Sequence, residues 1–226
     1  MAVPINVWPD RAVPHSGSPR RVVLVGAGHA HLYAIKRAAE FARRGFELVV
    51  IAPEDFWYSG LATGVLGGRY APEEDQVNIE TLVTAGGGGC RFVRDRIVSI
   101  DTAARSVGLA SGGSLSYDVL SLNLGSESHP IPGEGENVYA IKPLHRLWRL
   151  RQALETSVQT GIKPRIIVAG GGASGCEIAA NIHALLGGKA GAITVLARGE
   201  ILAEGDYARV SKHPEVIQAY LGAGHA

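Results

Sequence analysis

The chain has little cysteine, almost no net charge and no long apolar run, and each shortage argues against a class of protein. Its 226 residues include two cysteines, Cys90 and Cys176, which lie far apart and form no CxxC pair. A disulfide framework is therefore not expected, and a reducing cytoplasm is the expected compartment. The formal net charge is +1, which gives no electrostatic reason to expect a nucleic-acid partner.

Several familiar segments are also missing. No apolar stretch approaches the roughly 18 residues needed to cross a bilayer, so no transmembrane segment is expected. Residues 1–20 contain four prolines and no apolar core, which predicts a flexible tail rather than a signal peptide. No GxxxxGK[ST] phosphate loop occurs, so ATP binding of the P-loop kind is not expected.

Glycine is abundant, with 30 residues, and two groups of glycines form the same pattern. GAGHAH begins at Gly26 and GGGASG begins at Gly170, each after an apolar run and before a helix-like segment. In a Rossmann βαβ unit such a turn brings backbone and helix N-terminus close to a pyrophosphate. Two copies predict two dinucleotide sites. The alternative for a single copy is that its glycines only make a tight connection between strand and helix.

The two copies differ at the third glycine position of the GxGxxG pattern. The second copy is complete, with Gly170, Gly172 and Gly175. The first copy has Gly26 and Gly28, but His31 stands at the third position. This position normally lets helix and strand pack closely, so the first copy departs from the pattern where packing is tightest.

Other residues near these turns are candidates with open alternatives. Glu54 could contact a ribose or be a solvated loop residue, and Arg198 would favour the 2′-phosphate of NADP. His29, Ala30 and His31 begin the first helix, where packing or phosphate contact is favoured over a metal site, and no metal is predicted. Cys176 could be a small buried apolar residue or a redox group, of which the first is favoured.

The periodicity predicts an α/β fold. Apolar strand-like runs and helical spacing alternate through both halves of the chain, with a Pro- and Gly-containing linker near residues 130–133. Residues 56–70 combine aromatic side chains with glycines, a pattern more typical of a segment that lines a site than of one that fills a core. Strands are expected at residues 21–25, 47–52, 165–169 and 192–197, and the ranges 90–98 and 106–124 are expected to form strands around a turn at residues 111–113. Helices are expected at 29–44, 143–161 and 173–186.

Four strings in this order resemble the FAD-dependent pyridine nucleotide-disulfide oxidoreductase superfamily. Within it the chain looks most like the type II NADH dehydrogenase branch, and in particular like the flavoprotein module associated with bacterial selenide, water dikinase. The strings are VLVGAGHAH at 23–31, YSGLATGVLGGRY at 58–70, YDVLSLNLGS at 117–126 and VAGGGASGCEIA at 168–179.

The resemblance implies a Rossmann-like FAD-binding domain at residues 21–140 and a partial second Rossmann-like NAD(P)-binding domain at 141–192. Family members are longer, so the resemblance implies a truncated chain. Residues 193–226 resemble something else, the C-terminal end of a branched-chain amino acid ABC transporter ATPase. We therefore expect a fusion or an artefact with a junction near residues 191–193.

The resemblance also implies a role for individual residues. Glu177 and Tyr58 would lie near the flavin and the nicotinamide and are the predicted catalytic residues. The predicted cofactor-binding residues are Gly26, Gly28, His29, Ala30, His31, Glu54 and Gly125 for FAD, and Gly170, Gly172 and Gly175 for NAD(P)H.

The implied function is hydride transfer from NAD(P)H to FAD, with electrons then passed to a small acceptor. The paired cysteines of the disulfide-using branch are absent, so a quinone or another small molecule is the expected acceptor. The expected location is cytoplasmic, with peripheral association with the inner membrane as an alternative. The second hypothesis is a non-catalytic dinucleotide-binding remnant or fusion product. Oligomeric state is not predicted.

Overall fold

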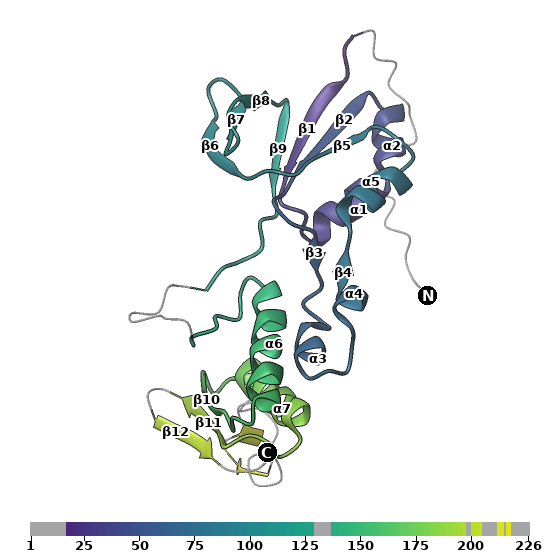
Figure 1. The fold of residues 1–226 in the computed structure, drawn as a ribbon. Coiled ribbons are helices and arrows are strands. Elements are labelled where there is room, and N and C mark those ends of the chain that lie inside the picture. Colours follow the sequence, from purple (N-terminus) through teal and green to yellow (C-terminus); the bar gives the residue numbers. More distant parts are fainter. Residues whose placement is uncertain (1–16, 129–136, 198–199, 205–211, 215, 218–226) are drawn as a thin grey trace. The chain divides into compact units, whose positions relative to one another are not determined.

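The computed structural model describes residues 17–128, 137–197, 200–204, 212–214 and 216–217, which form two compact units (Figure 1). The first unit comprises residues 1–56 and 77–125, and the second comprises 57–76 and 126–226. Residues 57–76 thus group with the second unit, although the sequence analysis assigned them to the FAD-binding domain. Most of the expected tail, the expected linker and Arg198 lie outside the described residues.

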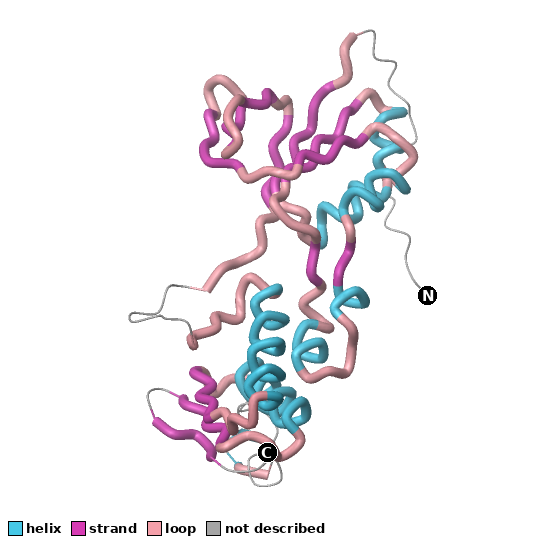
Figure 2. The backbone as a smooth tube through the Cα atoms, viewed as in Figure 1, coloured by secondary structure: helices cyan, strands magenta, loops and turns pink. Residues whose placement is uncertain are grey.

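The first unit is built on a four-stranded parallel sheet in the order β5-β2-β1-β9. Its two central strands end in buried apolar runs, at residues 23–25 and 48–51, because both faces are covered there. The helices lie on one side of this sheet and a small antiparallel sheet lies on the other (Figures 1 and 2). Leu24 and Leu48 belong to a buried cluster with residues of the helices, and Val23 and Val49 belong to one with Val107 of the small sheet. The strands are β1 (Arg20–Val25), β2 (Phe46–Ile51), β5 (Cys90–Val93) and β9 (Val119–Leu122), and the antiparallel strands are β6 (Ile97–Asp101), β7 (Ser106–Leu109) and β8 (Ser114–Ser116).

The helices of this unit are α1 (His29–Lys36), α2 (Ala38–Arg43) and α5 (Ile79–Ala85). The prediction of one helix over 29–44 is wrong, because the chain leaves helical geometry at Arg37, with φ −107° and ψ 20°. The Ala39 N–H donates to the Gly86 carbonyl at the end of α5 over 3.1 Å. This long-range bond replaces a helical bond within 29–44, which a local pattern cannot anticipate.

The strand predictions of the first unit agree with the structure in part. The strand expected over 90–98 ends at Val93, and β6 begins separately at Ile97. The range 106–124 contains β7, β8 and β9, and the expected turn at residues 111–113 lies between β7 and β8. Gly112 and Gly113 have φ values of +98° and +82°, which turn the chain between β7 and β8.

The second unit repeats the strand–turn–helix–strand order. β10 (Arg165–Ala169) pairs in parallel with β11 (Ala192–Ala197), and β12 (Glu200–Glu204) pairs with β11 in the antiparallel sense. The predictions for β10, β11 and α7 (Ala173–Leu186) agree with the structure, and α6 (His145–Gln159) lies within the range expected for it. Gly187 ends α7 in the left-handed conformation, as its C′ position favours.

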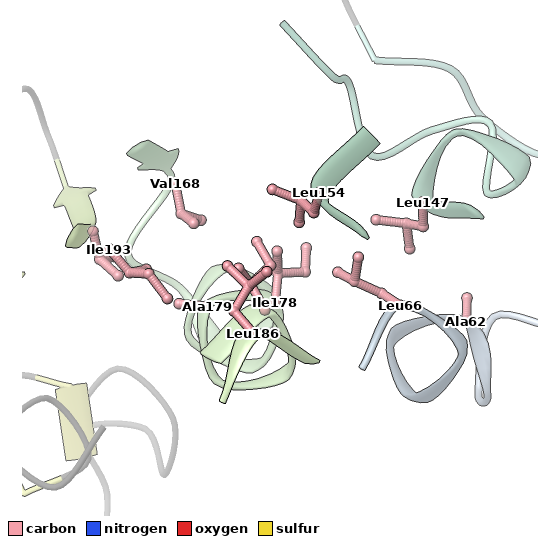
Figure 3. Close-up of a cluster of buried hydrophobic side chains, with 11 residues drawn as sticks. Ala62, Leu66, Leu147, Leu154, Val168, Ile178, Ala179, Leu186 and Ile193 are labelled. Atoms are coloured by element: carbon pink, nitrogen blue, oxygen red, sulfur yellow. The ribbon is translucent and has the colours of Figure 1, made fainter. Parts of the chain in front are cut away.

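The segment between β3 (Phe56–Trp57) and β4 (Gln76–Val77) contains α3 (Ala62–Leu66) and α4 (Pro72–Asp75). Ala62 and Leu66 of α3 share a buried cluster with Leu147 of α6 and Ile178 of α7 (Figure 3). Part of this aromatic and glycine-bearing segment therefore fills a core. Among the described residues, no helix has the length and apolar character to cross a membrane.

Candidate functional site

The first glycine turn joins β1 to α1 at the carboxyl end of the parallel sheet. Gly26 has a φ of +84° and donates its N–H to the Ile51 carbonyl over 2.8 Å. Gly28 is the N-cap of α1 and supplies no side-chain acceptor, so its first-turn N–H groups are of the kind that attract an anion. A Cβ on Gly26 or Gly28 would overlap Asn123, which follows β9. Both glycines are therefore required by the fold itself.

His31, which replaces the third glycine, supports this turn. Its side chain is 3% exposed, its Nδ1 lies 2.6 Å from the Gly26 carbonyl oxygen, and its Nε2 lies 2.9 Å from the Ser121 hydroxyl. One nitrogen donates and the other accepts in the neutral ring, so both hydrogen-bonding positions are used. The described residues contain no group of three or more potential metal ligands. Through its two hydrogen bonds, the His31 ring holds the first glycine turn to β9.

The other candidates of the first unit gather at the same sheet edge. His29 and Ala30 are exposed in the first turn of α1, and the His29 ring lies edge-on to Phe56 with centroids 4.7 Å apart. Glu54 is exposed after β2, and Gly125, with φ +75°, follows β9. Ligands of open parallel sheets bind outside the carboxyl ends of the strands, so these residues lie where a dinucleotide would bind.

Sequence reasoning missed Asp55, which stands beside the predicted Glu54. Asp55 accepts hydrogen bonds from the Ile79 backbone N–H over 3.1 Å and from Asn78 Nδ2 over 3.2 Å, and it pairs with Arg94 over 3.1 Å. These contacts tie the loop after β2 to the start of α5. Only the capping residue Asn78 gave a local signal, since a helix commonly begins after asparagine.

The second glycine turn joins β10 to α7. Gly170 has a φ of +125° and donates to the Leu196 carbonyl over 2.8 Å. Gly172 caps α7, again without a side-chain cap, and apart from its two sequence neighbours no atom of the described residues would lie within 4 Å of a Cβ there. A Cβ on Gly175 would instead overlap the Gly170 carbonyl oxygen. Gly175 is required for helix–strand packing, whereas the space beside Gly172 is open to a ligand.

The two predicted catalytic residues belong to the second unit. Glu177 is exposed on α7, and its Oε1 accepts a 2.6 Å hydrogen bond from the Thr63 hydroxyl of α3. Tyr58 is 44% exposed, and its backbone N–H donates to the Asp75 carbonyl over 2.9 Å. Sequence reasoning missed Thr63, because a contact across 114 positions leaves no local pattern.

Burial changes the acidity of three groups. Asp75 is 1% exposed, neither carboxyl oxygen has a hydrogen-bond partner within the described chain, and desolvation raises the pKa of the carboxyl to about 6. Desolvation also raises the pKa of the Cys90 thiol to about 11 and raises the pKa of Cys176. Both thiols are therefore protonated at neutral pH, which supports the interpretation of Cys176 as a small buried apolar residue.

We expect Asp75→Asn to stabilise the protein at pH 8 and not at pH 4. The pKa of about 6 in the folded state exceeds the ordinary value of 3.8, so the stability present below pH 4 is lost as the pH rises through 6. Removing the charge should raise the free energy of unfolding at pH 8 by on the order of 2 kcal/mol. Urea unfolding at the two pH values measures this, with exposed Glu73→Gln as the control. An equal gain at both pH values would argue against a charged Asp75.

Two strand–glycine turn–helix units, each leading into a helix whose N-cap makes no side-chain hydrogen bond, are the arrangement of a Rossmann-like α/β protein. The sequence matches the pyridine nucleotide-disulphide oxidoreductase family over residues 20–216, and the chain belongs to this family. The predicted superfamily and the predicted Rossmann-like fold class are thereby confirmed.

Curated relatives include NAD(P)H and quinone oxidoreductases. The chain is 26% identical over 199 residues to the external alternative NAD(P)H-ubiquinone oxidoreductase B2 of Arabidopsis thaliana mitochondria, covering 76% of this chain and 33% of the relative. It is 28% identical over 200 residues to the demethylphylloquinone reductase NdbB of Synechocystis, covering 81% and 48%. The chain spans less than half the length of these relatives.

Solved structures share the fold. The ferredoxin reductase for the CYP199A2 system of Rhodopseudomonas palustris has a TM-score of 0.62 and 25% identity, covering 87% of this chain and 46% of the neighbour. NDH2 from Plasmodium falciparum has a TM-score of 0.64 and 14% identity, covering 79% and 41%. The second match supports the fold alone.

Proposed function

We propose that this chain carries the nucleotide-binding parts of a flavoprotein that oxidises NAD(P)H. The observation that carries the proposal is the pair of glycine turns, each at the carboxyl end of a parallel strand and each leading into a helix with no side-chain cap. Such helix N-termini attract phosphates through free N–H groups and the helix dipole. Membership of the pyridine nucleotide-disulphide oxidoreductase family supports the same function.

FAD would bind the first unit. Gly26 and Gly28 would pass close to its pyrophosphate, and the backbone of His29 and Ala30 would present N–H groups to the phosphates. His31 would keep the turn in place through Gly26 and Ser121. The remaining candidate contacts are Glu54 for the ribose and Gly125 for the second FAD contact.

NAD(P)H would bind the second unit. Gly170 and Gly172 would approach its pyrophosphate, and the space beside Gly172 fits this role because, among the described residues other than its sequence neighbours, none would lie within 4 Å of a Cβ there. Gly175 would keep α7 close to β10. When both cofactors are bound, they supply hydride transfer from the nicotinamide to the flavin, and the protein binds and orients them. Glu177 would offer a hydrogen-bond acceptor beside the NAD(P)H turn, and Tyr58 would contact the flavin.

The finer identity is also part of the proposal. A quinone is the proposed acceptor, supported by two relatives named as ubiquinone and demethylphylloquinone reductases. This favours the type II NADH dehydrogenase branch, within which the module associated with selenide, water dikinase stays a prediction. We propose a cytoplasmic protein that approaches the inner membrane peripherally to reach a quinone.

We propose residues 21–140 as the FAD-binding region, apart from the segment 57–76 that packs with the second unit. β11 pairs with β10, and the family match continues to residue 216, so we assign 192–197 to the NAD(P)-binding fold. The ABC transporter resemblance of residues 193–226 stays a prediction.

Titration of the purified chain with FAD and, separately, with NADH and NADPH tests the proposed binding. We expect saturable quenching of flavin fluorescence by the protein and saturable enhancement of nicotinamide fluorescence. Absence of both would contradict the proposal. Binding of both without electron transfer would favour the second candidate, a non-catalytic dinucleotide-binding remnant.

A further inference from the structure

A hydrogen bond between α3 and α7 lies outside both glycine turns. The Thr63 hydroxyl donates to Glu177 Oε1 over 2.6 Å, although 114 positions separate the two residues in the chain. Both residues belong to the second unit. Thr63 lies within the 58–70 string but outside both glycine turns, so the role of this bond is inferred from the residues around it.

Apolar packing fixes the backbone of Thr63 independently of its hydroxyl. The neighbouring Ala62 is 3% exposed, Leu66 is fully buried, and both pack in the cluster that contains Ile178 (Figure 3). Arg151 of α6 donates from Nη1 to the Val65 carbonyl over 2.8 Å. Burial of these apolar side chains stabilises the docking of α3, so the hydroxyl is not needed to hold the helix in place.

Glu177 is held at its backbone as well as at Oε1. Asn181 Nδ2 donates to the Glu177 carbonyl over 2.9 Å. Gly67 leaves room for this amide, because a Cβ there would overlap Asn181 Oδ1. The Glu177 side chain is exposed, and within the described part of the chain only Thr63 donates to its carboxylate. Oε2 is therefore available to a ligand.

The place of Glu177 on α7 explains why its carboxylate needs a restraint. Residues four apart share a helix face, so Glu177 lies one turn beyond Ala173, the first residue of α7. Helical side chains lean toward the N-terminus, where free N–H groups attract anions. An unrestrained carboxylate could lean toward these groups and repel a phosphate bound at Gly172.

We propose that Thr63 is a positioning residue that holds the Glu177 carboxylate away from the phosphate site at the start of α7 and leaves Oε2 to accept a hydrogen bond from the bound dinucleotide. The proposal rests on the proposed binding of NAD(P)H to the second unit. Thr63 itself acts through Glu177 and needs no contact with the cofactor.

The test compares Thr63→Val, which keeps the shape but loses the donor, with Thr63→Ser, which keeps the donor. We expect Val to raise the Kd of NADH about tenfold, the size of a charge-assisted hydrogen bond, and Ser to keep it near the wild-type value. In a Glu177→Gln background, which removes the negative charge, we expect Thr63→Val to change the Kd of NADH less than twofold. A change of that size lies within the scatter found between sites that do not interact. Nicotinamide fluorescence measures the Kd on the full chain without any reaction.

Thermal unfolding of the same variants separates positioning from folding. We expect the Val and Ser variants to share one midpoint, because the buried residues of α3 are unchanged. If Thr63→Val binds NADH as tightly as the wild type does, the positioning role is overturned, but the proposed function is not. The same holds if Thr63→Val weakens NADH binding as much in the Glu177→Gln background as in the wild type. If the wild type binds no NADH or NADPH, the proposed function itself fails, and the positioning role fails with it.

Discussion

Replacing Gly172 with valine should abolish most NAD(P)H binding and leave the stability of the protein unchanged. The backbone of Gly172 is extended, with φ −77° and ψ 177°, which valine adopts readily, and within the described part of the chain a Cβ meets no atom within 4 Å beyond its sequence neighbours. The side chain would instead occupy the space where the dinucleotide backbone approaches the turn. We expect the Kd of NADH to rise about 100-fold, equivalent to about 2.7 kcal/mol, in a fluorescence titration.

Two neighbouring variants control this prediction. Gly172→Ala should give an intermediate loss, since a methyl group fills less of the same space. Gly175→Ala should lower the free energy of unfolding, because its Cβ would overlap the Gly170 carbonyl oxygen. NADH affinity of Gly172→Val equal to that of the wild type would show that nothing binds close to this turn.

Restoring the missing fingerprint glycine with His31→Gly should destabilise the first unit rather than improve it. The buried ring contacts the Gly26 carbonyl and the Ser121 hydroxyl, at 2.6 and 2.9 Å, and glycine would lose both contacts and leave a cavity. The low helix propensity of glycine adds to these losses, and we expect the free energy of unfolding to fall by about 3 kcal/mol. FAD affinity should fall as well, because Gly26 loses its support. Urea unfolding and flavin titration measure the two effects.

His29→Gly is the matched control, since His29 stands two positions earlier in the same helix turn and is exposed. We expect it to cost about 1 kcal/mol, from the low helix propensity of glycine and the loss of the edge-on contact between His29 and Phe56. A His31→Gly variant as stable as the His29→Gly variant would contradict the supporting role of the buried ring.

The second unit was predictable because its signals are local. The apolar runs at 165–169 and 192–197 form β10 and β11, and Gly187 ends α7 where the sequence places a helix stop. The first unit was less predictable because long-range contacts override local spacing. The Ala39 N–H bonds to Gly86 rather than within one continuous helix, so the expected helix is interrupted at Arg37.

The candidate site divides in the same way. The glycines of both turns could be found from spacing alone, because their chemistry depends on a short backbone segment. The contacts of His31, Thr63 and Asp55 could not, since Ser121, Glu177 and Arg94 lie far from them in the sequence. Asp75 also gave no signal, because its raised pKa depends on burial by distant residues. The residues that form a glycine turn can therefore be found from the sequence, whereas the residues that support it are found only from the structure.

The most direct test of a two-cofactor flavoprotein is the visible absorption of the purified chain with FAD, recorded before and after addition of NADH or NADPH without oxygen. We expect a yellow protein whose flavin band bleaches on addition of NADH, of NADPH or of both. It also predicts that Gly172→Val stays yellow and bleaches far more slowly. A wild-type chain that stays colourless with FAD, or stays yellow after both nicotinamides, would contradict the account.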